Sequence, residues 1–287
     1  MLLSTSEQRW QLPAPVSIDP ELRRLGLPDP LLALLLRTCC VAGDRVAWPA
    51  PTYSLYRVLA DLAGLVAIEV AADAGHAVPP GVLAADARVN FLCTPNSPSG
   101  KPLPLDAIAA FARAARGLVV VDEAYVDFGG ASALSILQDH PNMVVTRSFS
   151  KSFSLAGLRL GLLFGHEDFV AELEKGKDSY NVSRLAAAAG VAALEDIDWM
   201  RANVAKVCAT RQRVADELRR RGFAPAESSA NFLWVDCKAQ GGGRPVYERL
   251  RQGSVLVRYF SGLPDGFRVT IGTDAEMDRF LAVLDGR

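Results

Sequence analysis

An α/β fold with a mostly parallel central sheet is what this sequence predicts, and three observations support it. Short segments rich in Val, Leu and Ile alternate with helical patterns between residues 29 and 165, as strands covered by helices on both faces do. Half of the 287 residues are apolar, which is enough for a large buried core. The last third has a different order, a long charged helix followed by strands and helices, and indicates a second, smaller α+β domain.

Six apolar segments are the expected strands of the larger domain: Arg45–Trp48, Leu65–Val70, Val89–Cys93, Leu118–Val121, Met143–Thr146 and Leu160–Phe164. Helical patterns separate several of them, over Leu31–Cys40, Tyr53–Ala63 and Leu105–Ala115. We therefore assign residues 29–182 to a large domain in which helices sandwich the sheet. Prolines interrupt residues 1–28, which are expected to form an irregular N-terminal segment.

The pattern changes after residue 165, and residues 183–287 are expected to form the small C-terminal α+β domain. Helices are predicted over Glu167–Lys175, Ser183–Leu194 and from about Trp199 to Arg221. After them we expect a strand over Ala230–Val235, a glycine-rich loop over Gly241–Gly243 and a helix over Pro245–Gln252. Two further strands, Val255–Tyr259 and Phe267–Ile271, and a closing helix are expected to complete the domain.

Composition and charge exclude several classes of function. The 31 basic and 32 acidic residues leave a formal net charge of −1, which offers no electrostatic footprint for nucleic acid or an anionic membrane. The five cysteines include no CxxC pair and the three histidines lie far apart, so neither a metal site nor a disulfide framework is expected. No segment resembles a membrane span or a secretory signal, so we expect a cytoplasmic protein that acts on small molecules.

An acid directly follows the expected strand over residues 118–121. Open α/β sheets bind ligands at the carboxyl ends of their strands, so Asp122 and Tyr125 are expected to face a cleft. A buried carboxylate needs a cationic partner, and a protonated pyridine nitrogen would be one. The alternative interpretation is a helix N-cap or a structural aspartate after a strand.

A second polar cluster surrounds Lys151. Residues 146–161 follow another expected strand and place this one lysine among hydroxyls and a guanidinium, those of Ser148, Ser150, Ser152 and Arg159. A neutral lysine amine forms Schiff bases with carbonyl compounds, and hydroxyls with a guanidinium suit a phosphate. A solvated Ser/Lys loop with an incidental arginine is the alternative.

These motifs resemble the pyridoxal-phosphate (PLP) aminotransferases of fold type I, classes I and II, and within them the histidinol-phosphate aminotransferase family. The matching segments occur in the family's order over about residues 29–287. They are Pro-Thr-Tyr53-Ser-Leu-Tyr, Cys-Thr-Pro-Asn-Ser-Pro-Ser-Gly100, Asp122-Glu-Ala-Tyr125, Ser-Phe-Ser-Lys151 with Arg159, Ser179-Tyr-Asn-Val, Ala230-Asn-Phe and Phe-Arg268-Val-Thr-Ile-Gly-Thr. The lysine–arginine spacing, preceded by Asp-x-x-Tyr, is the most specific of them.

The resemblance implies a role for each matched residue. Lys151 would hold PLP as a Schiff base and move the proton at the substrate α-carbon, while Asp122 would keep the pyridine nitrogen protonated. Tyr125 would hydrogen-bond the ring's O3′. The remaining cofactor contacts would be Tyr53, Asn96, Ser97, Ser148, Ser150 and Arg159, and the substrate contacts Arg268, Arg258 and Asn231. Arg268 would pair with the substrate α-carboxylate, whereas ordinary structural roles are the alternative for Tyr53 and Arg258.

The chain departs from the family pattern at two places. The family places asparagine directly before Pro-x-Gly, where this chain has Ser97, with Asn96 one residue earlier. The front of the family's chain, including a helix start beneath the phosphate, has no counterpart here. The equivalent stretch keeps only Asp29 in register, and Pro28 and Pro30 remove two N–H donors. We expect weakened PLP retention from these departures.

Amino transfer from histidinol phosphate to 2-oxoglutarate, a step of histidine biosynthesis, is therefore the leading functional hypothesis, with a homodimer implied by the resemblance. Two alternatives stay open at this point. One is a PLP-dependent decarboxylase of a phosphorylated amino acid, which shares the fold and the lysine segment. The other is a shortened aminotransferase paralogue that has lost turnover, whether through a misplaced start or through decay of the gene.

Overall fold

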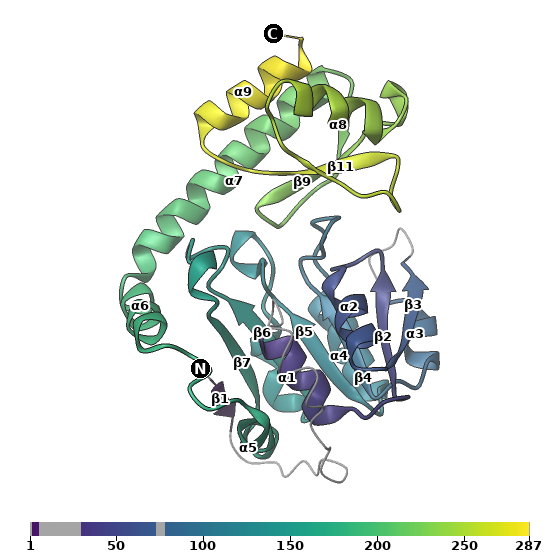
Figure 1. Ribbon diagram of the computed structural model, residues 1–287, viewed down its shortest axis with the longest axis vertical. Helices are drawn as coiled ribbons and strands as arrows, with labels where there is room; N and C mark the ends of the chain where they lie inside the picture. Colours follow the sequence, from purple (N-terminus) through teal and green to yellow (C-terminus); the bar gives the residue numbers. More distant parts are fainter. Residues whose placement is uncertain (1, 6–29, 73–77, 287) are drawn as a thin grey trace.

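A computed structural model describes residues 2–5, 30–72 and 78–286 of the chain. Figure 1 shows a large α/β unit in purple to teal and a smaller unit in green to yellow. Helices α6 (Arg184–Glu195) and α7 (Ile197–Arg220) run along one side and connect the two units. In the described part of the chain, no helix is both long enough and apolar enough to cross a membrane.

The large unit is built on a seven-stranded sheet in the order β1-β7-β6-β5-β4-β2-β3. Strands β2 to β6 are mutually parallel, and β7 runs antiparallel to β6. The mostly parallel sheet expected from the sequence is therefore confirmed. Its strands are β1 Leu2–Thr5, β2 Arg45–Ala50, β3 Val66–Ala71, β4 Val89–Cys93, β5 Leu118–Asp122, β6 Met143–Ser148 and β7 Gly161–His166.

Strand β1 was not expected, because residues 1–28 were interpreted as irregular. Residues 2–5 instead pair in parallel with β7, from Leu2 opposite Leu163 to Thr5 opposite His166. The physical reason is that an edge strand presents unpaired backbone N–H and C=O groups, which a short apolar segment can satisfy despite the prolines that follow it. Residues 6–29 lie outside the described residues.

Helices cover both faces of the large sheet, and each face has its own apolar cluster. Helices α1 (Pro30–Cys39), α2 (Leu55–Leu62) and α5 (Glu167–Gly176) cover one face, where Val120 and Phe91 belong to the core. Helices α3 (Pro80–Ala84) and α4 (Leu105–Ala114) cover the other, with Val119 and Val121. Burial on both faces explains why β4 and β5 are buried throughout and read as continuous apolar runs.

The small unit is a four-stranded antiparallel sheet, β10-β11-β9-β8, packed against α7, α8 and α9. The strand expected over Val255–Tyr259 shortens to two residues, because only they pair with β11. The bounds are β8 Ala224–Pro225, β9 Phe232–Asp236, α8 Gly243–Gln252, β10 Arg258–Tyr259, β11 Gly266–Thr270 and α9 Asp274–Leu284. The described residues also form four short 3-10 helices, over Val126–Phe128, Ala133–Asp139, Ala156–Leu158 and Lys238–Gln240.

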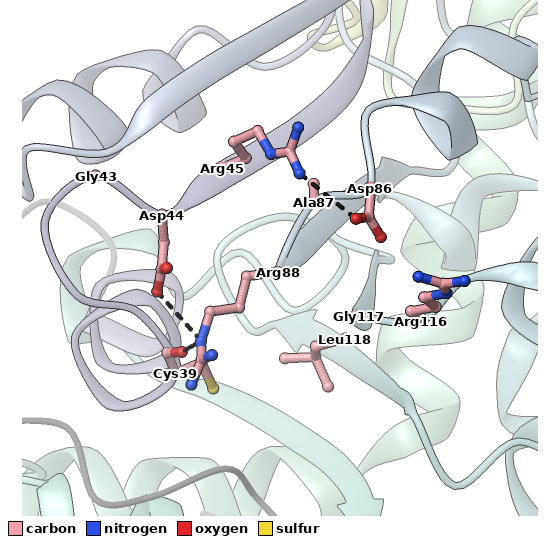
Figure 2. Close-up of a pocket in the computed structure, with 10 residues that line it drawn as sticks. All are labelled: Cys39, Gly43, Asp44, Arg45, Asp86, Ala87, Arg88, Arg116, Gly117 and Leu118. Atoms are coloured by element: carbon pink, nitrogen blue, oxygen red, sulfur yellow. Dashed lines mark hydrogen bonds and ion pairs between the residues drawn. The ribbon is translucent and has the colours of Figure 1, made fainter.

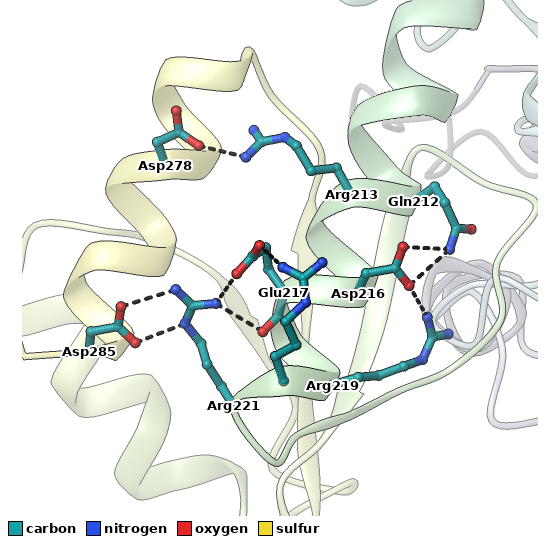
Figure 3. A network of polar contacts seen from close by, with 9 residues as sticks. Gln212, Arg213, Asp216, Glu217, Arg219, Arg221, Asp278 and Asp285 are labelled. Carbon is teal, nitrogen blue, oxygen red and sulfur yellow. Dashed lines mark hydrogen bonds and ion pairs between the residues drawn. The ribbon is translucent and has the colours of Figure 1, made fainter.

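Ion pairs join the ends of α7 and α9 across the outer surface of the small unit (Figure 3). Arg221 contacts both carboxylate oxygens of Asp285, with its Nε at 2.8 Å and its Nη2 at 3.0 Å. Arg213 Nη1 lies 2.7 Å from Asp278. Exposed pairs of this kind contribute about 0–1 kcal/mol each, so the apolar cluster beneath them carries most of the stability while the pairs fix the relative position of the helices.

Candidate active site

A cavity of about 230 Å³ lies at the carboxyl ends of the central strands, between the large unit and Arg268 of the small unit. It gathers eight of the twelve site residues predicted from the sequence: Tyr53, Asp122, Tyr125, Ser148, Ser150, Lys151, Arg159 and Arg268. These side chains come from five separate parts of the chain. Their convergence at the edge where parallel strands end is the position expected for a ligand site in an open α/β sheet.

The two central strands β5 and β6 place the acid and the lysine segment side by side. Asp122 at the end of β5 is paired in register with Thr146 on β6. The chain then leaves β6 at Ser148 and enters a loop whose shape is fixed by a hydrogen bond from the backbone N–H of Ser150 to Ser148 Oγ, at 3.1 Å. Lys151 follows in this loop and therefore faces the same cavity as Asp122.

Asp122 is a buried carboxylate with specific hydrogen-bond donors. Tyr56 donates its hydroxyl to Oδ2 at 2.7 Å, and the backbone N–H of Ala124 donates to Oδ1 at 3.2 Å. Burial raises the pKa of Asp122 above its usual value, while the Tyr56 bond, the Ala124 bond and the positive charge of Lys151 act in the opposite direction. A cation entering the cavity next to Asp122 would stabilise the charged form further.

The Lys151 ammonium lies 5.4 Å from the centre of the Tyr125 ring. Its charge acts on Asp122 across the same cavity. The acid and the amine therefore line the same cavity.

Behind the lysine loop, an ion-pair network holds the backbone in place. Arg147 Nε contacts Glu123 Oε2 at 3.1 Å, and its Nη1 contacts Asp127 at 3.4 Å. Ser152, the residue after Lys151, donates to Asp127 at 2.5 Å. Glu123 also accepts the backbone N–H of Ala133, and burial raises the pKa of Glu123 despite these partners. These contacts hold the backbone before and after Lys151, and the sequence motif did not indicate them.

Three residues suited to an anion, Ser148, Ser150 and Arg159, line the cavity. Leu31 and Leu32 of the first turn of α1 line the same cavity. A helix N-terminus favours negative charge, and Pro30, the first residue of α1, occupies the position where a missing N–H costs least. The preceding stretch, from Gly26 to Asp29, lies outside the described residues.

On the small unit, Arg268 presents a guanidinium group that is positioned for an anion. Its Nη1 donates to Ser97 Oγ at 2.9 Å, and its Cζ lies 4.8 Å from the centre of the Phe232 ring. The Nε of Arg268 is buried and has no hydrogen-bond partner within the structure. Burying a donor without a partner is costly, so an incoming carboxylate would satisfy a group that the fold leaves available.

Comparison with known proteins places this site in a family. Residues 29–284 match the family model described as aminotransferase class I and II. The chain belongs to the class I and II aminotransferases. It is 40% identical over 259 residues to histidinol-phosphate aminotransferase 1 of a Nostoc species, covering 89% of this chain and 73% of that protein. It is 39% identical over 258 residues to the histidinol-phosphate aminotransferase of Syntrophotalea carbinolica, covering 89% of this chain and 74% of that protein.

Solved structures agree with this assignment. The histidinol-phosphate aminotransferase of Sinorhizobium meliloti, solved in complex with pyridoxal-5′-phosphate, is 29% identical with a TM-score of 0.82, covering 89% of this chain and 74% of that one. The L-threonine-O-3-phosphate decarboxylase of Porphyromonas gingivalis is 21% identical with a TM-score of 0.73, covering 85% of this chain and 77% of that one. The second likeness shows the shared fold alone, which is that of the fold type I enzymes.

Four of the residues predicted for this aminotransferase do not line the cavity. The Asn96 side chain accepts from Thr52 at 2.6 Å and donates to the Pro51 carbonyl at 3.0 Å, so the loop occupies both ends of its amide, and it faces another cavity of about 300 Å³. The Ser97 hydroxyl contacts Arg268, which lines the cavity. Asn231 and Arg258 are absent from the lining.

These last two residues have other contacts. The Asn231 carbonyl accepts the backbone N–H of Ile271 at 2.8 Å. Arg258 is exposed on the short strand β10, where its guanidinium lies 5.4 Å from the centre of the Phe260 ring. The substrate contact expected for Arg258 stays a prediction.

Sequence analysis missed three side chains of the aminotransferase site. Tyr56 holds Asp122, and Cys93 lines the cavity. Thr146 is 5% exposed, lines the cavity, and its Oγ1 has no partner within the structure. The available signal was its position at a strand end in register with Asp122. A buried hydroxyl and a buried guanidinium nitrogen, both unpaired beside an acid and an amine, fit a planar heterocycle that carries polar groups and a phosphate.

A larger cavity, of about 350 Å³, lies at the opposite edge of the sheet (Figure 2). It is lined by charged residues that pair with one another, because Arg88 Nε contacts Asp44 at 3.3 Å and Arg45 contacts Asp86 at 3.5 Å. It lies at the amino ends of the strands, where β2 and β5 begin at Arg45 and Leu118. The candidate site of this aminotransferase therefore stays at the carboxyl edge.

Proposed function

We propose that this aminotransferase uses pyridoxal phosphate to transfer the amino group of histidinol phosphate to 2-oxoglutarate, giving imidazole acetol phosphate and glutamate. The observation that carries the proposal is the placement of Asp122, Lys151 and Arg268 on one cavity, in a chain 36–40% identical to histidinol-phosphate aminotransferases over most of its length. The decarboxylase alternative rests on a shared fold at 21% identity and is not favoured.

Different residues of the cavity would contact different parts of the cofactor. Lys151 would bind the aldehyde carbon, Asp122 would accept the ring N–H, and Tyr125 and Tyr53 would contact the ring oxygen and face. Ser148, Ser150 and Arg159 would bind the phosphate, where the arginine fork suits its oxygens. When bound, pyridoxal phosphate supplies an electron sink for the carbanion that forms at the substrate carbon.

The chain's own groups then move the protons. Lys151, the amine on this cavity, would take and return the proton at the substrate α-carbon. Asp122, whose charged form is favoured by the hydrogen bonds from Tyr56 and Ala124, would hold the proton on the ring nitrogen. Burial raises the pKa of Tyr125, so this phenol remains a hydrogen-bond donor in the neutral range.

A direct assay tests the proposal. The purified chain, saturated with pyridoxal phosphate, should form glutamate from histidinol phosphate and 2-oxoglutarate, and should release no carbon dioxide from a phosphorylated amino acid. Carbon dioxide release without glutamate would support the decarboxylase instead. If neither product forms although the cofactor is bound at Lys151, the chain is the inactive paralogue.

Arg268 is expected to set the affinity for glutamate and 2-oxoglutarate. Replacing it by lysine keeps the charge but removes the planar fork and the Nε donor. Hydrogen bonds to charged groups contribute about 1.5–3 kcal/mol, so R268K should raise the KM for 2-oxoglutarate by about 10- to 100-fold. Steady-state kinetics would measure this, with R251K as the matched control because Arg251 is an exposed arginine of α8 that pairs with Glu248. Equal effects of the two variants would contradict the role given to Arg268.

We also propose a homodimer that includes the surface of α6 and its flanking residues. The support is a set of exposed apolar side chains on and beside this helix, such as Leu185 at 81% and Trp199 at 56% exposure. Apolar groups gathered on one surface mark an interface, and two-fold dimers are the commonest assemblies. L185E should shift the protein toward monomer in sedimentation velocity experiments, whereas L256E, at an equally exposed position on the small unit, should not. A monomeric parent chain would contradict the proposal.

The proposed reaction belongs to histidine biosynthesis and would take place in the cytoplasm. The support is the activity for which the relatives are named.

A further inference from the structure

We propose that Tyr56 is a positioning residue of the active site, whose hydroxyl holds the carboxylate of Asp122 ionised and oriented toward the cofactor ring. The inference rests on the proposed function, because it assigns a task to the hydrogen bond beneath the acid. Tyr56 does not line the cavity itself, so it would act on the reaction only through Asp122.

The contact is direct and buried. The Tyr56 hydroxyl lies 2.7 Å from Asp122 Oδ2, and the tyrosine side chain is fully buried in the core. An ionised carboxylate has about four lone-pair positions. Tyr56 and the backbone N–H of Ala124 occupy one position on each oxygen, which fixes the plane of the carboxylate and leaves acceptor capacity for a ring N–H on the side of the cavity.

The tyrosine ring is held rigidly, so the hydroxyl has a defined position. It stacks on Phe91 with ring centres 4.5 Å apart and planes inclined by 12°. Trp48 and Tyr53 pack against it with ring centres at 5.9 and 5.6 Å. These contacts come from β4, β2 and the turn before α2. Aromatic packing of this kind orders the ring. The tyrosine side chain therefore loses little conformational entropy when its hydroxyl bonds to Asp122.

Tyr56 can only donate in this pair. Burial first, and then the charge of Asp122, raise the pKa of Tyr56 well above its usual value, so the phenol keeps its proton. Other titratable groups that face Asp122 are Cys93 on β4 and Tyr125 after β5, and burial raises the pKa of both, that of Cys93 to about 12. With these two neutral, Lys151 is the cation and Tyr56 the neutral side-chain donor that favour the charged form of Asp122.

A single segment of the chain therefore supplies both a residue of the cavity lining and the hydroxyl that donates to Asp122. Tyr53 and Tyr56 are three residues apart at the start of α2, and the backbone N–H of Tyr56 bonds to the Tyr53 carbonyl at 3.1 Å. Tyr53 lines the cavity, whereas Tyr56 lies outside its lining and contacts Asp122. A serine or alanine at residue 56 would leave the buried carboxylate short of a donor, which is costly.

The test is a titration of Asp122 in the cofactor-free protein, which does not depend on the reaction. Carbon NMR of protein labelled at aspartate carboxyl carbons, with D122N to identify the resonance, should show a higher pKa for Asp122 in Y56F than in the parent chain. Y247F removes a hydroxyl from a half-buried tyrosine of the small unit that also stacks on another aromatic ring, and should leave this pKa unchanged.

A kinetic arm separates positioning from packing. In the cofactor-loaded enzyme, Y56F should lower kcat/KM at neutral pH by about tenfold and move the acid limb of the pH profile upward. In the D122N background the same substitution should have no further effect on kcat/KM, because the two residues act as one unit. An unchanged Asp122 pKa in folded Y56F, or full additivity with D122N, would overturn the proposal. If the NMR shift appears while no substrate is turned over, the proposed function fails and the role of Tyr56 stands.

Discussion

Replacing Lys151 by alanine is expected to lower the transamination kcat/KM by about a thousandfold or more and to abolish covalent retention of pyridoxal phosphate. The amine is the group that would bind the cofactor aldehyde and carry the α-proton, and a positioned acid–base group alone contributes about 10²–10⁴-fold. Borohydride reduction followed by peptide mass spectrometry would locate the cofactor on Lys151 in the parent chain and on no residue in K151A.

The matched control is K175A, because Lys175 is an exposed lysine of α5 paired with Glu172. It should keep parental activity and cofactor content. K151A should also raise the pKa of Asp122, since the lysine charge is one of the influences that lower it. Pyridoxal phosphate trapped on K151A in the parental amount would show that another amine serves as the attachment point.

Replacing Asp122 by asparagine is expected to give the second-largest loss, about 10²–10³-fold in kcat, the scale on which preorganised charge stabilises a transition state. The amide has the same shape and can still accept from Tyr56, so the fold should persist. It cannot hold a proton on the ring nitrogen by opposite charge, so the electron sink would weaken. Single-turnover kinetics would report the loss on the proton-transfer step.

D61N supplies the control for Asp122, because Asp61 is an exposed acid of α2 that pairs with Arg57. Its activity should stay within about twofold of the parent, since exposed pairs contribute about 0–1 kcal/mol. Parental single-turnover rates in D122N would mean that the carboxylate serves the fold and not the chemistry.

The pH dependence of the parent enzyme should follow from the same acid. Burial raises the pKa of Asp122, so activity that requires its charged form should fall at a higher pH on the acid side than an exposed aspartate would give. The Tyr56 bond and the Lys151 charge oppose this shift, which is why removing either should move the acid limb further toward neutral pH.

Most of the fold could be predicted from the sequence, because burial on both faces of a parallel sheet leaves a local signature. The apolar runs at β4, β5 and β6 gave the strands within one or two residues. Short edge strands gave a weaker signature: β1 and β8 were not expected, and β10 is shorter than the strand expected over Val255–Tyr259. β1, β8 and β10 have four residues or fewer, and their pairing depends on which neighbouring edge is open, which only the assembled sheet decides.

The candidate site divides in the same way. The sequence alone determined that Asp122 ends a buried strand and that Lys151 lies among hydroxyls, because the rule that ligands bind where parallel strands end needs only local patterns. Tertiary structure decided which side chains meet: Tyr56 reaches Asp122 across 66 residues and Arg268 reaches Ser97 across 171. Hydrogen bonds need atoms about 3 Å apart, and that distance depends on strand order and on the packing of the helices, which periodicity does not contain.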